Sequence, residues 1–150
     1  MNLRSPAFEN GEWIPPRYTC EGENLSPPLA WSGVPEEARA MALVLDDPDA
    51  PAKVWVHWVL YNLPPGAGMI PEGSRGLEAT AREGRNDFGD LGYGGPCPPR
   101  GTHRYRFRLF ALDTHLDVGE GCSKSELLRA MEGHVLAEAE LIGTYAKIRR

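Results

Sequence analysis

The chain has 150 residues and a net charge of −5, with a sequence pI near 5.4. This length suits a single domain, and the acidic balance argues against a non-specific nucleic-acid binder, which needs clustered lysines and arginines. Apolar residues make up 41% of the chain, yet no stretch approaches the roughly 20 apolar residues that span a bilayer. We therefore expect one globular domain over residues 1–150, without a membrane span.

The cysteines and the first residues bear on the cellular compartment. Cys20, Cys97 and Cys122 are few, odd in number and without a CxxC spacing. The N-terminal residues lack the apolar centre of a signal peptide. This pattern predicts reduced thiols in a cytoplasmic protein, with one disulfide and one free thiol as the alternative.

Two segments in the first half of the chain have the character of buried strands. Turn-forming residues dominate the first 35 positions and predict short strands and ordered loops there. Residues 40–45 are an apolar run, and residues 53–63 (KVWVHWVLYNL) form the clearest strand, closed by two prolines. Alternation places two sets of side chains on opposite, largely apolar faces of this central strand: Trp55, His57, Val59 and Tyr61 against Val54, Val56, Trp58 and Leu60.

The second half combines a long loop, a strand and a helix. Residues 64–101 are mostly turn formers, and their aromatics and prolines favour an ordered functional loop. Residues 103–113 predict a strand with one apolar face and one arginine-bearing face. Ser123 and Glu126 form a capping-box pattern, which predicts a helix that ends near Val135 or Leu136 and precedes a final strand.

The segment LDDPDAP, residues 45–51, places carboxylates directly after an apolar run. Each proline fixes its own φ and restricts the residue before it, so the loop is stiff and can aim Asp47 or Asp49. A solvated turn that starts at an Asp-Pro pair is the plain alternative. Asp46 falls on the opposite face of the strand and is expected to take no part in a site.

Two histidines lie on the predicted strands. His57 or His103 alone is typical of a core histidine bonded to a backbone carbonyl. If the two strands are neighbours, however, both imidazoles, Tyr105 and the Asp47 loop converge. Such a cluster suits three uses, namely a metal site, acid–base catalysis or an anion pocket.

The anion pocket explains most of the cluster. A nearby carboxylate raises the pKa of an imidazole and keeps it cationic, and Tyr105 adds a hydroxyl donor. The glycine-rich turn at Gly94 and Gly95 can present backbone N–H groups, whereas the prolines around Pro96 shape the rim. The hypothesis of a metal site is weaker because the spacing of these residues matches no recognised ligand motif. The hypothesis of catalysis is weaker because the sequence shows no convincing nucleophile.

The motifs together resemble a known family. DPDAP, HWVLYNLP, GYGGPCPPRGTHRYRFRLFAL, ENLSPPLAWSGVP, GRNDFG and GHVLAEAELIGTY lie far apart and cover nearly the whole chain. They closely resemble the phosphatidylethanolamine-binding protein family, in its bacterial and archaeal Raf kinase inhibitor-like (YbhB/YbcL-type) branch. The resemblance implies a mainly β fold with a large central antiparallel sheet, a smaller sheet and few peripheral helices.

The resemblance also implies a small anion pocket at one end of the large sheet. Matched motif by motif, its ligand-binding residues are Asp47, Asp49, His57, Gly94, Gly95, Pro96, His103 and Tyr105. A cis peptide bond is expected before Pro48 or among Pro96, Pro98 and Pro99. No cofactor or metal is expected.

These features favour a non-enzymatic protein that binds a phosphate-like or phosphorylated group and regulates a partner such as a kinase. A phosphoester hydrolase that uses His103 and Asp47, and a kinase or protease inhibitor that acts through its surface, are the alternatives. A homodimer is plausible for a small β-rich domain.

Overall fold

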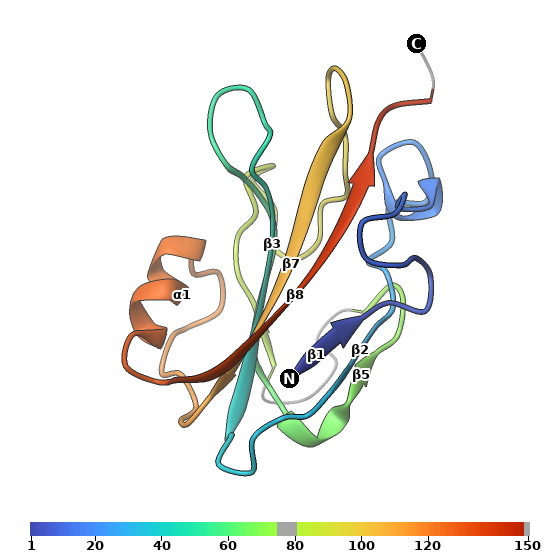
Figure 1. Ribbon diagram of the computed structural model, residues 1–150. Helices are drawn as coiled ribbons and strands as arrows, with labels where there is room; N and C mark the ends of the chain where they lie inside the picture. Colours follow the sequence, from blue (N-terminus) through green and yellow to red (C-terminus); the bar gives the residue numbers. More distant parts are fainter. Residues whose placement is uncertain (75–80, 149–150) are drawn as a thin grey trace.

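The computed structural model describes residues 1–74 and 81–148, which form two β-sheets and one α-helix (Figure 1). The larger sheet is antiparallel throughout, in the order β6-β4-β3-β7-β8, and the smaller has the order β1-β2-β5. This architecture confirms the predicted fold class. The elements are β1 (Asn2–Arg4), η1 (Pro16–Tyr18), β2 (Leu29–Ser32), β3 (Ala40–Asp47), β4 (Trp55–Leu63), η2 (Pro65–Ala67), β5 (Met69–Ile70), β6 (Arg82–Glu83), β7 (His103–Leu112), α1 (Lys124–Met131) and β8 (Val135–Tyr145).

Both faces of the larger sheet are covered, as Figure 1 shows. The smaller sheet packs Leu3, Trp31 and Ile70 against one face, and α1 packs Leu127 and Met131 against the other. All eight residues of β3 are buried, because this strand lies in the centre of a sheet covered on both sides. The apolar run at residues 40–45 was therefore correctly predicted as a buried strand.

The alternation predicted for β4 is wrong near its start. Leu45 of β3 pairs with Trp58, whereas the next residue, Asp46, pairs with Val56, so that His57 is the extra residue of a β-bulge. Val56 consequently shares the α1 side of the sheet with Val59. A bulge shifts the register by one residue, which a strict period of two cannot anticipate.

The predicted helix exists but is shorter than expected. Ser123 caps it with the predicted capping box, and the helix ends at Met131. Gly133 then adopts a left-handed backbone with φ of 80°, and β8 already begins at Val135. Glycine takes this conformation without the steric cost that a Cβ brings, so it ends the helix earlier than the apolar pattern suggests.

The long segment 64–101 contains η2, β5 and β6 in addition to loops, and its residues 75–80 lie outside the described part of the chain. Within the described part, no helix is long and apolar enough to cross a membrane. The peptide bonds before Pro48, Pro96, Pro98 and Pro99 are all trans, so the expected cis bond is absent at these positions.

Candidate functional site

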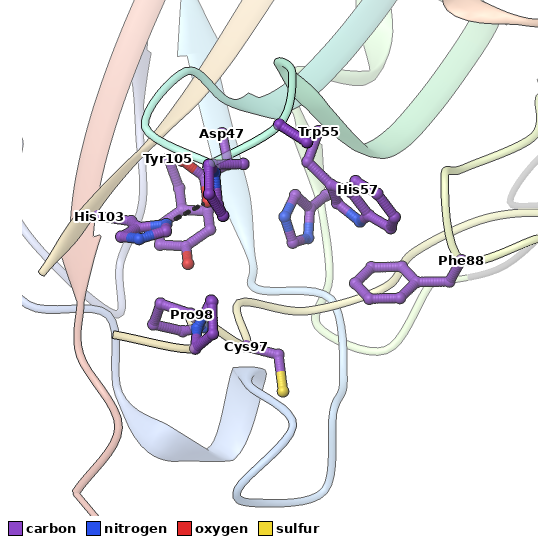
Figure 2. A pocket seen from close by; sticks show the side chains of 12 residues that line it. Asp47, Trp55, His57, Phe88, Cys97, Pro98, His103 and Tyr105 are labelled. Atoms are coloured by element: carbon purple, nitrogen blue, oxygen red, sulfur yellow. Dashed lines mark hydrogen bonds and ion pairs between the residues drawn. The ribbon is translucent and has the colours of Figure 1, made fainter. Parts of the chain in front are cut away.

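A pocket of about 310 Å³ lies at the edge of the larger sheet where β3 ends and where β4 and β7 begin. The β3–β4 loop and the segment before β7 close around it (Figure 2). His57 and His103 lie on strands that flank β3 and are not neighbours, but both reach the same pocket. Its lining is mostly apolar: Asp47, Ala50, Pro51, Ala52, Trp55, His57, Phe88, Cys97, Pro98, Pro99, His103 and Tyr105.

Asp47 and His103 form a buried pair in this pocket. Asp47 is the last residue of β3, His103 is the first of β7, and Asp47 Oδ2 lies 2.6 Å from His103 Nδ1. Asp47 Oδ1 accepts the backbone N–H of Asp49 at 2.8 Å, so the loop itself orients the carboxylate. Because a carboxylate accepts hydrogen bonds, Nδ1 of His103 carries a proton and Nε2 is the nitrogen left for a ligand.

His57 enters the pocket from the β-bulge. Its Nδ1 donates to the carbonyl of Gly94 at 2.5 Å, which leaves Nε2 as the available nitrogen. Burial lowers the pKa of His57, despite the Gly94 hydrogen bond and the nearby Asp47 charge, which act in the opposite direction. The expectation of a cationic imidazole is therefore wrong for His57, whose Nε2 is a hydrogen-bond acceptor at neutral pH.

Tyr105 carries an unsatisfied hydroxyl. Its side chain is fully buried, and its Oη makes no hydrogen bond of normal geometry with the described residues, although the Asp47 carboxylate is close enough to act on it. Burial, and then the negative charge of Asp47, raise the pKa of Tyr105, so the phenol stays protonated. Figure 2 shows this hydroxyl pointing into the space between His103 and Pro98. The ring of Tyr105 also meets the ring of His57 edge-on, with centroids 5.3 Å apart.

Asp49, also predicted as a ligand-binding residue, does not line the pocket. It accepts hydrogen bonds from the backbone N–H and the guanidinium of Arg104 at 2.8–2.9 Å. These hydrogen bonds hold the pKa of Asp49 at about 2. Arg104 therefore holds the Asp49 side chain outside the pocket. No pattern in the loop sequence indicated this pairing.

The sequence predicted that the glycine turn presents its N–H groups to the pocket, but the structure shows these groups bonded elsewhere. The N–H of Gly94 donates to the carbonyl of His57 at 2.9 Å, and that of Gly95 donates to Asn24 Oδ1 at 2.9 Å. Pro96 lies outside the lining, and its carbonyl accepts the N–H of Cys20. These residues support the pocket from behind because their polar groups already have partners.

Cys97 was missed as a pocket residue, and the prediction of reduced thiols is wrong for two of the three cysteines. Cys97 forms a disulfide with Cys20, whereas Cys122 is free and buried. The two bonded residues are 77 positions apart, and the fold alone brings their Cα atoms to 5.4 Å. The spacing of the cysteines in the sequence carries no such information, because a disulfide depends on tertiary distance.

Trp55 and Phe88 were likewise not assigned to the site, although both lie on its wall. Their rings meet edge-on with centroids 5.6 Å apart, and the Phe88 ring also packs against His57. Phe88 sits so close to Gly94 that a Cβ there would lie 2.4 Å from the ring. The sequence shows both aromatic residues, Trp55 in β4 and Phe88 in the GRNDFG motif. Only the folded structure brings them together at the pocket.

Asp46 does not line the pocket, as expected, but it is the centre of a buried cluster of ion pairs. Its fully buried carboxylate binds Arg106 Nε at 2.9 Å, Arg108 Nη2 at 3.0 Å and Lys124 Nζ at 2.6 Å. Burial by itself raises the pKa of Asp46, but the hydrogen bonds from Arg106 and Lys124 outweigh it and hold the pKa below its usual value. This cluster joins β3 and β7 to the start of α1.

No group of three or more His, Cys, Asp or Glu side chains within residues 1–74 and 81–148 is arranged to hold a metal ion. The polar side-chain atoms that the pocket offers to a ligand include the Tyr105 hydroxyl and the Nε2 atoms of His57 and His103. The surrounding wall is apolar. This arrangement suits a small group that can both accept and donate hydrogen bonds.

Comparison with known proteins agrees with these motifs. The profile of the phosphatidylethanolamine-binding protein family matches residues 4–146. A UPF0098 protein of Methanothermobacter thermautotrophicus is 56% identical over 98% of this chain and 99% of its own length. A second UPF0098 protein, from Chlamydia muridarum, is 48% identical over 97% of this chain and 98% of its own length.

Two crystal structures share the fold. A phosphatidylethanolamine-binding protein homologue of Chlamydia trachomatis superposes with a TM-score of 0.92 at 45% identity, covering 97% of each chain. YbcL of E. coli gives a TM-score of 0.91 at 34% identity, covering 97% of this chain and 98% of its own. Sequence and structure thus agree over almost the entire chain, which belongs to the phosphatidylethanolamine-binding protein family.

Proposed function

We propose that this chain is a non-enzymatic binding protein whose pocket holds a phosphate-like anion or a phosphorylated small group. The observation that carries the proposal is the buried hydroxyl of Tyr105, which lacks a partner among the described residues and points into the pocket. A buried polar group without a hydrogen bond costs about 1–3 kcal/mol. A bound oxyanion would accept this hydrogen bond and remove that cost.

The two histidines refine the chemistry of the proposed ligand. His57 is neutral with Nδ1 bonded to Gly94, so its Nε2 accepts a hydrogen bond. His103 lines the same ligand space, and because its Nδ1 is held by Asp47, its Nε2 is the nitrogen left for the ligand. A phosphate monoester that keeps one proton offers an O–H to His57 and oxygens to Tyr105 and His103. Such esters have a second pKa of about 6, so about one molecule in ten keeps this proton at pH 7 and most do so below pH 6.

The apolar wall adds a requirement. Trp55, Phe88, Pro98 and Pro99 surround the polar groups. A phosphate alone leaves these apolar surfaces in contact with water. An organic substituent on the phosphate would bury them and gain affinity at roughly 25 cal/mol per Å² of apolar surface. We therefore expect phenyl phosphate to bind more tightly than inorganic phosphate.

Calorimetric titration with both compounds tests the proposal. Binding at one site per chain, with His57→Ala weakening it, is the expected outcome. Absence of binding to the wild-type protein would contradict the function, and an unchanged affinity in His57→Ala would contradict the pocket as its site. The exposed His134, which contacts Asp113, offers a matched control in His134→Ala, which should bind as the wild type does.

One arrangement favours a second candidate function. The Asp47–His103 pair resembles a carboxylate-oriented general base, as a phosphoester hydrolase would use. Turnover of phosphoesters that disappears in His103→Ala would support the hydrolase. A phosphoester panel without turnover, together with binding in the titration above, would leave the non-enzymatic function.

Regulation of a partner protein, such as a kinase or a protease, extends the same proposal, with the pocket as the docking point for a phosphorylated residue. Pull-down with wild-type and Tyr105→Phe protein distinguishes this from docking elsewhere, because only a pocket-dependent partner is lost from the variant. A cytoplasmic location and a homodimer remain predictions, and thiol trapping in cells and sedimentation would test them respectively.

A further inference from the structure

We infer that the Cys20–Cys97 disulfide is a redox site that controls the ligand pocket: its reduction loosens one wall and lowers the affinity for the ligand. This inference rests on the binding function proposed above and adds its regulation. It starts from one juxtaposition, in which Cys97 lines the pocket while its bonded partner, Cys20, is exposed to solvent in the turn after η1.

The pocket segment before Cys97 is held by hydrogen bonds to η1 and to the loop that follows it. The Tyr93 hydroxyl donates to the Tyr18 carbonyl at 2.6 Å, and the Gly95 N–H donates to Asn24 Oδ1 at 2.9 Å. The N–H of Cys20 donates to the Pro96 carbonyl at 3.1 Å. Residues 93–96 would therefore stay in place without the disulfide.

The segment after Cys97 has no such support. Residues 98–102 make no hydrogen bond with any other part of the chain that the structure describes, and regular pairing resumes only at His103. Two members of this segment, Pro98 and Pro99, form the pocket wall. The disulfide and the start of β7 are thus the two anchors of the wall, and reduction removes one of them.

The exposed side of the disulfide also makes the reaction feasible. A thiolate of a dithiol reductant attacks Sγ of Cys20, forms a mixed disulfide there and displaces Cys97 as a thiolate, which takes up a proton. The second thiol of the reductant then displaces Cys20 and closes the reductant's own disulfide. The protein gains two electrons and two protons in total, and the reductant loses them.

The expected effect on binding follows from the ordering of the wall. In the oxidised protein Pro98 and Pro99 are already placed against the ligand space. In the reduced protein the ligand must order them on binding, which lowers the affinity. A coupling at the lower end of the usual range predicts a Kd that is about five- to tenfold higher after reduction.

Titration of phenyl phosphate into the full-length protein, oxidised and then reduced with excess dithiothreitol, tests the inference. The oxidised protein should bind about five- to tenfold more tightly than the reduced one, and re-oxidation should restore the affinity. Cys20→Ser should bind like the reduced protein in both conditions. Cys122→Ser, a matched control at the buried free cysteine, should respond as the wild type does.

A second measurement needs no ligand. Backbone order parameters from NMR should fall at Gly101 and Thr102 on reduction, while those of Gly94 and Gly95 stay unchanged. If the oxidised protein fails to bind phenyl phosphate, the proposed function is wrong, and the order parameters still decide whether the disulfide anchors the wall. Equal affinities in the two redox states, or unchanged order parameters at Gly101 and Thr102, would overturn the redox inference alone.

Discussion

Asp47 Oδ2 lies 2.6 Å from His103 Nδ1, and both side chains are almost completely buried. The contact joins the end of β3 to the start of β7, two positions that are 56 residues apart in the chain. It fixes the ring of one pocket histidine, so that Nε2 faces the ligand space. The stiff DPDAP loop thus contributes a positioning carboxylate to the pocket, whereas its second carboxylate, Asp49, stabilises the loop from outside.

The two carboxylates should consequently behave differently on substitution. Asp47→Ala removes the partner of His103 and should weaken phenyl phosphate binding by about tenfold or more, since a hydrogen bond to a charged group contributes about 1.5–3 kcal/mol. Asp49→Ala should leave the affinity within about twofold and lower the free energy of unfolding by at most about 1 kcal/mol, because its pair with Arg104 is largely exposed. Calorimetry and urea denaturation measure the two quantities. Equal losses of affinity in both variants would contradict these assignments.

Tyr105→Phe should separate stability from binding. The substitution removes a buried hydroxyl that has no partner in the described structure, so the ligand-free variant should be as stable as the wild type or more stable by about 1 kcal/mol. The same variant should bind phenyl phosphate about tenfold more weakly, because it lacks a donor to the ligand oxygen. A variant that is clearly less stable, or one that binds normally, would show that the hydroxyl already has another function in the fold.

Asp46→Asn should destabilise the protein strongly without a direct effect on the pocket lining. Arg106, Arg108 and Lys124 converge on this buried carboxylate, and its neutralisation leaves their charges uncompensated, at a cost of about 3 kcal/mol. The lowered pKa of Asp46 also predicts that its contribution to stability is complete above about pH 4 and is lost as the pH falls below that value. Urea denaturation between pH 3 and pH 7 measures both effects; a variant with wild-type stability would contradict the assignment.

His57 should make the folded state sensitive to mild acid. Burial lowers the pKa of His57, so the unfolded chain binds its proton more readily, and stability should fall as the pH drops below about 6.5. His57→Gln cannot be protonated and should show a flatter stability profile between about pH 5 and pH 7. Thermal unfolding across this range measures the difference. Parallel profiles for the two proteins would show that His57 is not held neutral by the fold.

The parts of the fold that follow local patterns could be predicted. The apolar run of β3, the β-branched and aromatic residues of β4, the two faces of β7 and the capping box of α1 each carry their own signal in the sequence. The failures arise where strand pairing or a local backbone conformation overrides these patterns. The bulge at His57 depends on how β3 and β4 pair, and the early start of β8 depends on the left-handed backbone of Gly133.

The site shows the same division. His57, His103, Tyr105 and Asp47 were named from their distinctive motifs, and the structure places all four in the pocket lining. Asp49 and the N–H groups of Gly94 and Gly95 were assigned wrongly, since partners remote in the sequence occupy them. The Cys20–Cys97 disulfide and the convergence of three cations on Asp46 likewise depend on distances that exist only in the folded chain.

The most direct test of the central claim is a crystal structure of the oxidised protein soaked with phenyl phosphate. We predict a tetrahedral group in the pocket, with oxygens about 2.6–3.0 Å from Tyr105 Oη and from Nε2 of His57 and His103. An empty pocket, with phosphate bound only at exposed arginines or lysines, would contradict the account. So would a metal ion bonded at about 2.0–2.1 Å to the imidazole nitrogens.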